Sequence, residues 1–141
     1  MNRRSLRILL VFGAPIVASL ARADDLTAAD RILCTADAIN VCYDDGTCET
    51  GSSEALNVPQ FIEVDLVQKR LSTTKASGLN RASAIDSIRR ADGSIVLQGF
   101  EKGRAYSFVI DEKSGALTVA VAGPSRGVNA FGACTPLTAS K

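Results

Sequence analysis

Bulky apolar residues alternate with small or polar ones in the second half of the chain, which is the pattern of strands with one buried face. Residues 104–111 (RAYSFVID) and 116–122 (ALTVAVA) show it most clearly. Because side chains on a strand alternate between two faces, we expect the bulky set of each segment to point into the core. These inward positions are Tyr106, Phe108 and Ile110 in the first segment, and Leu117, Val119 and Val121 in the second.

Glycines divide this half of the chain into segments of strand length. Gly93, Gly103, Gly115 and Gly127 follow one another at spacings of 10, 12 and 12 residues. Turn signals at such spacings are typical of an antiparallel meander, and the Asp-Gly and Lys-Gly pairs that end at the first two glycines suit tight hairpins. The strands expected between the glycines are residues 94–100, 104–111, 116–122 and 127–134.

The first half of the chain predicts further strands, separated by polar loops at 49–57 and 72–81. The additional strands are expected at residues 31–43, 58–66 and 83–90, with a short one near 69–73. Seven or eight strands predict an all-β fold, an antiparallel meander closed into a small disulfide-stapled barrel, because closure removes the exposed edges of a sheet. A two-sheet sandwich remains the alternative.

The first residues have the composition of a secretory signal peptide. Arg3, Arg4 and Arg7 precede a mostly apolar stretch at 8–20, and a small-x-small cleavage site ends at Ala23. The apolar stretch is shorter than the ~20 residues that span a bilayer. We expect residues 1–23 to be removed and residues 24–141 to form a single β domain, periplasmic or secreted, with no transmembrane segment in the mature chain. The paired arginines leave twin-arginine export open beside the general secretory route.

The cysteines are interpreted as disulfides, because an exported chain folds under oxidising conditions. Zinc sites prefer tight cysteine spacings, usually with histidine, and this chain contains no histidine. Cys42 and Cys48 flank an Asp-Gly turn that brings them together, whereas Cys34 and Cys42 would lie roughly 26 Å apart on one extended strand. We therefore favour the pairs Cys34–Cys134 and Cys42–Cys48; the pairing 34–48 with 42–134 stays open.

The composition argues against most catalytic classes. Without histidine, Ser-His-Asp and Cys-His machinery is excluded, as are ordinary catalytic zinc sites. The chain also lacks the P-loop, the dinucleotide fingerprint and the nucleophile-elbow motif. We expect a protein that is not an enzyme, with no catalytic residues, metal ligands or cofactor.

Charge is distributed unevenly along the chain. Residues 24–65 contain ten acids and one base, a net charge of −9, while residues 66–141 contain five acids and eleven bases, a net charge of +6. The candidate binding residues are the bases in or beside the later strands, namely Arg81, Arg89, Arg90, Lys102, Arg104 and Arg126. They could engage an anionic partner, or they could pair with the acidic early strands. Nucleic acid is not an expected partner, because aromatic residues for base stacking are few.

The segment DGSIVLQGFEKGRAYSFVIDEKSGALTVAV, followed by FGAC, resembles a family of small exported bacterial proteins of unknown function. The resemblance covers most of the mature chain and is tightest over residues 82–134. It implies periplasmic residence and a β-rich fold, and it supplies no active site. The size and disulfide content are also similar to those of small-barrel periplasmic lysozyme inhibitors, although their inhibitory motif is not recognisable in this chain.

Three functions are consistent with these observations. The leading hypothesis is a non-enzymatic exported β domain that binds an envelope protein or an anionic envelope component. One alternative is a carrier of a small apolar ligand in the barrel interior, which predicts a lined cavity of ~300 Å³ or more. The other alternative is a small periplasmic enzyme inhibitor.

Overall fold

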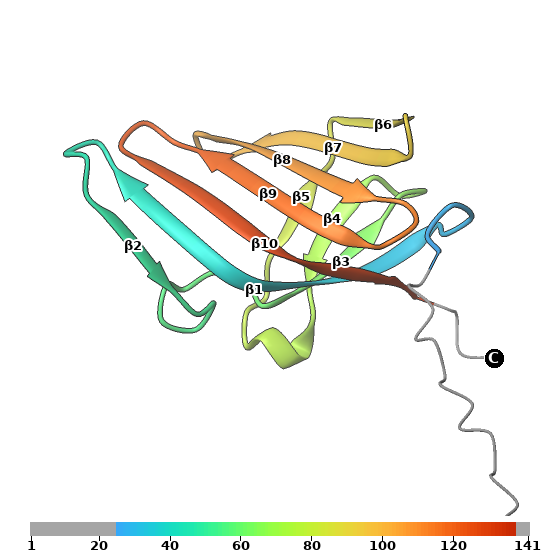
Figure 1. Ribbon diagram of the computed structural model, residues 1–141, viewed down its shortest axis with the longest axis horizontal. Helices are drawn as coiled ribbons and strands as arrows, with labels where there is room; N and C mark the ends of the chain where they lie inside the picture. Colours follow the sequence, from blue (N-terminus) through green and yellow to red (C-terminus); the bar gives the residue numbers. More distant parts are fainter. Residues whose placement is uncertain (1–24, 138–141) are drawn as a thin grey trace, which may run out of the picture.

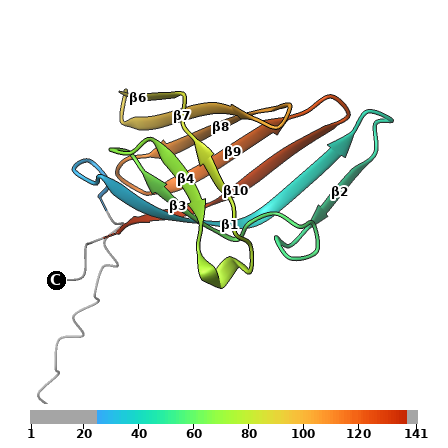
Figure 2. The same cartoon turned by 180° about the vertical axis from the view of Figure 1, so that it is seen from behind.

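The computed structural model describes residues 25–137, so the predicted signal peptide at 1–23 lies outside the described residues. The fold is all-β, as expected: an antiparallel ten-stranded sheet curls into a half-barrel (Figure 1). The sheet order is β5-β4-β3-β1-β10-β9-β8-β7-β6, and β2 pairs separately with β1. Two walls, one of β3 to β5 and one of β6 to β9, rise from the central pair of β1 and β10 (Figure 2).

The strands are β1 (Arg31–Tyr43), β2 (Cys48–Gly51), β3 (Phe61–Asp65), β4 (Arg70–Thr73), β5 (Ala82–Ala84), β6 (Ser87–Ala91), β7 (Ser94–Glu101), β8 (Arg104–Asp111), β9 (Ala116–Ala122) and β10 (Arg126–Pro136). A short 3-10 turn, η1 (Lys75–Ser77), lies between β4 and β5. The described strands outnumber the seven or eight expected for two reasons. The polar segment of β2 has no hydrophobic signal, and the segment expected at 83–90 is two strands.

That division leaves the barrel incompletely closed. After β5, which pairs with β4 in the first wall, the chain crosses at Ile85 to the second wall. There it forms β6, which pairs with β7. Ile85 is buried at this crossing, and its N–H donates to the Lys69 carbonyl. In the described chain β5 and β6 are therefore the two edges of the sheet, and one chain segment joins them instead of a ladder of hydrogen bonds.

The hairpins form where the glycine pairs predicted them. Asp92 and Gly93 have φ of 54° and 75°, and Lys102 and Gly103 have φ of 49° and 77°. Two successive residues with positive φ are the signature of the two-residue turn that matches strand twist. The bulky side chains of β8 and β9 point inward, as the alternation predicted.

Strand β1 contains a bulge that the sequence pattern did not reveal. Its pairing with β10 shifts between Ala36 and Ala38, so Asp37 is an extra residue. Inward positions are even-numbered before the bulge, as at Cys34, and odd-numbered after it, as at Val41. Opposite the bulge, a Cβ on Gly132 would overlap the Thr35 carbonyl, so only glycine allows the two strands to approach this closely.

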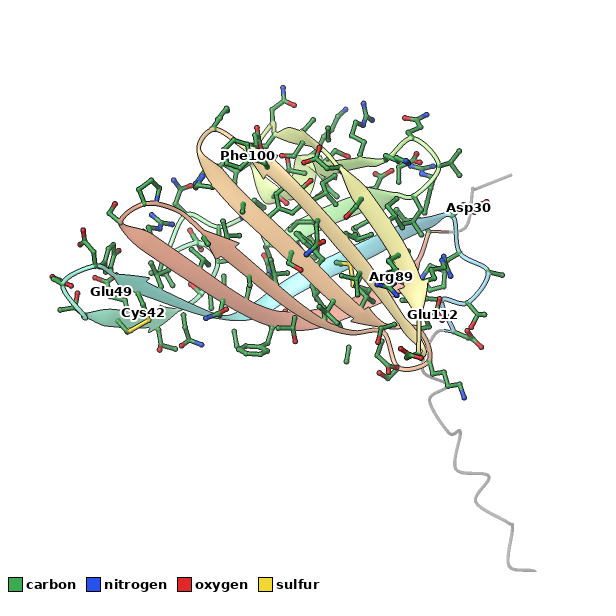
Figure 3. All side chains as sticks on the ribbon, turned by 90° about the horizontal axis from the view of Figure 1, so that it is seen from above. Asp30, Cys42, Glu49, Arg89, Phe100 and Glu112 are labelled. Carbon is green, nitrogen blue, oxygen red and sulfur yellow. A yellow bond between two sulfur atoms is a disulfide. The ribbon has the colours of Figure 1, made fainter. Side chains whose placement is uncertain are left out.

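Both favoured disulfides are present. Cys34–Cys134 joins β1 to β10 with a Cα separation of 4.0 Å and is buried, linking residues 100 apart in sequence. Cys42–Cys48 joins β1 to β2 with a Cα separation of 4.1 Å (Figure 3). It clips the hairpin arm that β1 and β2 form beyond the half-barrel.

One end of the half-barrel, called the closed end here, is filled by side chains. Leu26 is fully buried there among apolar residues of both walls, and its N–H donates to the Glu112 carbonyl over 2.7 Å. The other large side chains that are fully buried in the same core include Ile32, Val64, Ile95, Leu97 and Ile110. The opposite end, called the open end, is where the β7–β8 and β9–β10 turns lie, and there the packing stops short of filling the interior.

Candidate functional site

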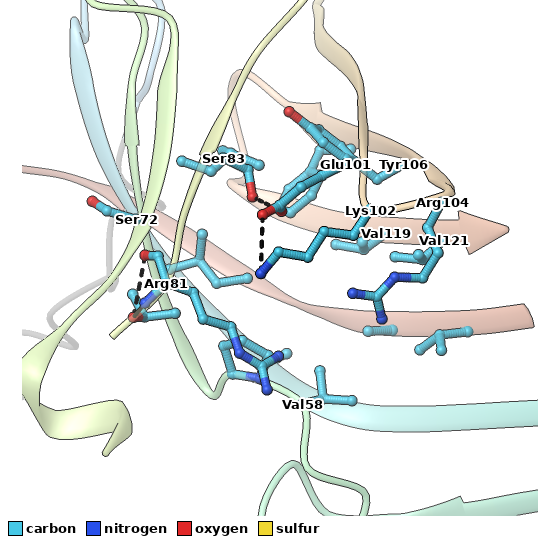
Figure 4. Close-up of a pocket in the computed structure, with 18 of the residues that line it drawn as sticks. Val58, Ser72, Arg81, Ser83, Glu101, Lys102, Arg104, Tyr106, Val119 and Val121 are labelled. Carbon is cyan, nitrogen blue, oxygen red and sulfur yellow. Dashed lines mark hydrogen bonds and ion pairs between the residues drawn. The ribbon is translucent and has the colours of Figure 1, made fainter. Parts of the chain in front are cut away.

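A cavity of about 340 Å³ enters the half-barrel from the open end, between the two walls (Figure 4). Its interior surface is largely apolar. The apolar lining includes Ile62 and Leu71 from the first wall, Phe108, Val119 and Val121 from the second, and Val128 and Ala130 from β10. The inward faces of β8, β9 and β10 thus serve as core at the closed end and as cavity wall at the open end.

Cationic side chains surround the mouth of this cavity. Arg81 reaches it from the segment before β5, and Lys102 and Arg104 reach it from the β7–β8 hairpin opposite (Figure 4). Arg126, at the start of β10, also lines it. Four cations face one carboxylate, Glu101, so the mouth carries net positive charge.

The arginines of this mouth lack acidic partners within the described part of the chain. Lys102 Nζ lies 3.8 Å from Glu101 Oε1. Among residues 25–137, no carboxylate lies within 4.0 Å of the guanidinium of Arg81, Arg104 or Arg126. Internal pairing with the acidic early strands, the alternative considered from the sequence, therefore does not account for these three.

Gly123 makes room for the side chain of Arg104. The Gly123 N–H donates to the Arg126 carbonyl over 3.0 Å, and a Cβ on Gly123 would lie 3.2 Å from Arg104 Cγ. A side chain at this position would press on the aliphatic stem of Arg104. The absence of a side chain at position 123 therefore leaves room for Arg104 beside the turn that leads into Arg126.

A pair of side-chain hydrogen bonds fastens β5 to the second wall beside the cavity. Ser83 donates to Glu101, and the Tyr106 hydroxyl donates to the Ala84 carbonyl. Tyr106 crosses over Gly99, where a Cβ would overlap its ring, and stacks edge-on against Phe108 at 5.9 Å. Burial, with Asp86 and Glu101 nearby, raises the pKa of Tyr106, so its hydroxyl stays protonated and remains a donor at neutral pH.

The other two candidate residues lie elsewhere. Arg89 is exposed on the outer side of β6, and Arg90 belongs to the closed end. Arg90 donates to the carbonyls of Thr27 and Ala29 over 2.8 and 2.7 Å, and to Glu112 over 2.8 Å. These bonds fix the segment that carries Leu26, so Arg90 is a structural residue. The structure thus brings four of the six predicted binding residues together.

Sequence reasoning missed the carboxylate of the mouth and the part of the cavity wall that precedes β3. Glu101 lies opposite Arg104 in the β7–β8 register, a pairing that the Lys-Gly turn signal between them implies. Val58 and Pro59 line the cavity from a segment expected to be strand, but β3 begins only at Phe61. Proline has no N–H to donate to a ladder, which explains the later start.

The acidic turn of the hairpin arm is exposed to solvent. Asp45 accepts hydrogen bonds from the N–H and hydroxyl of Thr47, and these lower the pKa of its carboxyl group. In the described part of the chain, no three acidic or cysteine residues cluster as a metal site. No helix between residues 25 and 137 has the length and apolar character needed to cross a membrane.

No protein-family model matches the chain, and no curated protein matches it.

Proposed function

We propose that this protein is a non-enzymatic binding domain for a small anionic amphiphile. The apolar part of the ligand enters the half-barrel, and its anionic group rests among the arginines of the mouth. The observation that carries this proposal is the set of three guanidinium groups around an apolar-lined cavity that have no carboxylate partner among residues 25–137. The proposal joins the leading hypothesis from the sequence, an anionic envelope component as partner, with one of its alternatives, an apolar ligand in the barrel interior.

Electrostatics favours an anionic head group at the mouth. Cations gathered without counter-charges repel one another, and a bound anion relieves that repulsion. Guanidinium groups bind carboxylate or phosphate oxygens through paired N–H donors. Because the head group would sit at an exposed mouth, added salt should weaken its binding.

The cavity itself favours a small apolar moiety. Its volume of about 340 Å³ lies at the lower end of the ~300–1,000 Å³ range of small-molecule sites. Burying apolar ligand surface against Val119, Val121 and Phe108 contributes roughly 25 cal/mol per Å². Tyr106 lines this cavity, and its pKa is raised, further from neutral pH. A hydroxyl that stays protonated suits a binding role better than proton transfer.

Export from the cytoplasm is part of the proposal. Two cross-strand disulfides suit an oxidising compartment, where an envelope lipid or its acidic fragment would be available as ligand. This inference agrees with the leader expected at residues 1–23.

The test is calorimetric titration of the oxidised protein with three ligands of equal chain length: decanoate, decyl phosphate and decanol. We expect either anion to bind at least ~10-fold more tightly than the alcohol, which is about 1.4 kcal/mol. The double variant Arg104→Gln/Arg126→Gln should lose that preference. Arg89→Gln removes an equally charged but outward residue and should keep it.

The two anions distinguish a carboxylate from a phosphate head group. Binding of neither anion to the wild-type protein would refute the proposal. Equal losses in the double variant and in Arg89→Gln would also refute it, because the effect would then come from net charge and not from the mouth.

A further inference from the structure

Three cross-strand rows of side chains on the outer side of the second wall and of the central pair contain no charged residue. Each row runs over β7, β8, β9, β10 and β1. The strand registers define them. The upper row is Val96, Val109, Thr118, Phe131 and Ala38; the middle row is Gln98, Ser107, Ala120, Asn129 and Asn40; the lower row is Phe100, Ala105, Ala122, Gly127 and Cys42. We call these rows the outer face.

The lack of charge on the outer face is a local property. The outer side of β3 and its neighbours is charged, with Arg31 paired to Glu63 and with Asp65 opposite Arg70. The outer face instead holds three of the four large apolar side chains that are exposed in the described chain. Phe100, Phe131 and Val109 are 66%, 47% and 43% exposed. An exposed face of this kind marks an interaction surface.

We propose that the outer face binds the outer face of a second copy, giving a two-fold symmetric dimer. In such a contact the same patch meets itself, so any charge on it would meet or approach its own copy. A face without charge avoids that repulsion. The proposal is independent of the ligand site, which lies on the inner side of the same strands.

The rows complement one another when the two-fold axis runs along the middle row. That axis places the upper row of one copy over the lower row of the other. Phe131 then lies over Gly127 of the second copy, and Val109 lies over Ala105. A shallow depression lined by Ala105, Ala120 and Gly127 already exists on this face, and it would receive the larger side chains.

The middle row is suited to lie on the axis because its polar members carry both donors and acceptors. On the axis, Asn129 would face Asn129 and Gln98 would face Gln98. An amide can hydrogen-bond to another amide, which a carboxylate or an ammonium group cannot do with its own copy. The axial residues can therefore satisfy one another.

The size of the outer face predicts a weak dimer. Five strands at ~4.8 Å and three rows along the strands span roughly 24 by 20 Å, so at most about 480 Å² per copy can be buried, because the outer side of the curled sheet is convex (Figure 1). The total of at most about 960 Å² is below the size of standard stable interfaces. We therefore expect reversible association that is visible only at high protein concentration.

The test is sedimentation equilibrium of the oxidised chain from micromolar to millimolar concentration. We expect the wild-type protein to dimerise, and Asn129→Asp and Asn129→Lys each to weaken dimerisation at least ~10-fold, because like charges would meet on the axis. An equimolar mixture of the two variants should dimerise again. Val67→Asp, at the exposed apolar residue outside the face, should behave as wild type.

A chain that stays monomeric at millimolar concentration would overturn the proposal. So would dimerisation that both Asn129 variants leave intact, or a mixture that fails to associate while each variant gives a wild-type far-ultraviolet circular dichroism spectrum.

Discussion

The two ends of the half-barrel use the same chemistry for opposite purposes. At the closed end, Arg90 donates hydrogen bonds to main-chain carbonyls and to Glu112, and these bonds fix the segment that carries the buried Leu26. At the open end, Arg104 and Arg126 reach a cavity and have no carboxylate partner in the described chain. The difference shows that an arginine's role here depends on whether its partners belong to the fold.

Each end also has its own disulfide. Cys34–Cys134 is buried and lies toward the closed end, while Cys42–Cys48 clips the arm beside the open end. The first joins residues 100 apart and the second residues six apart. The long-range link between the first and last strands therefore lies in the core, whereas the short-range link constrains only the hairpin arm.

Removing the buried disulfide should lower the free energy of unfolding more than any other change proposed here. In the chain-entropy model a bridge across ~100 residues stabilises by up to ~4.7 kcal/mol, against about 2 kcal/mol for the short loop. Cys34→Ala/Cys134→Ala is thus expected to lose about 3–5 kcal/mol of unfolding free energy in urea titrations. Cys42→Ala/Cys48→Ala should lose about 2 kcal/mol or less, and equal losses would contradict the comparison.

Truncating Arg90 is expected to come next. Arg90→Ala leaves the Thr27 and Ala29 carbonyls without their donor, and because the side chain is partly exposed we expect a loss of about 2 kcal/mol. The matched change at the open end, Arg126→Ala, should alter stability by no more than ~0.5 kcal/mol. Thermal unfolding of both variants measures the contrast, which fails if Arg126→Ala is the more damaging change.

A smaller effect is expected where β5 is fastened beside the cavity. Tyr106→Phe removes the hydroxyl that donates to the Ala84 carbonyl, at a cost of about 1 kcal/mol. The same change should speed amide hydrogen exchange in β5 while leaving the closed end protected. Tyr43→Phe, at the other tyrosine, serves as control, and similar exchange in both variants would remove the assigned role of Tyr106.

The smallest effect concerns acid stability at the turn after β8. The Ser114 N–H and hydroxyl donate to Asp111 and lower the pKa of its carboxyl group. Because the folded-state pKa lies below the unfolded one, this contribution is present above about pH 4 and disappears as pH falls through the folded-state value. Ser114→Ala should raise the pKa of Asp111 in carboxyl NMR titrations; an unchanged value would contradict the assignment.

The glycine spacing and the alternation of β8 and β9 made most of the second wall predictable. Residues at 92–93 and 102–103 specify their turns locally, because positive φ favours few residue types. The disulfide pairing followed from an Asp-Gly turn and from the expected contact of first and last strands. These features depend on residues that are close in sequence, or on one long-range contact, that between the first and last strands.

The missed features depend on tertiary geometry. Nothing in RILCTADAINVCY marks Asp37 as an extra residue, since the bulge exists only relative to Gly132 on β10. The candidate bases could be identified by charge, but adjacent Arg89 and Arg90 point to opposite sides of β6. Charge alone also could not show that Arg90 lies at the closed end, far from the mouth. That position depends on where β6 lies in the folded sheet.

The bulge at Asp37 determines which of the two disulfides a reductant in solution can reach first. By changing which residues of β1 face inward, it sends one cystine to the interior and the other to the surface of a single strand. A thiol in solution can reach the sulfur atoms of the arm without disturbing the core, whereas the buried pair is shielded until the sheet opens. One inserted residue thus gives the chain one accessible disulfide and one shielded disulfide.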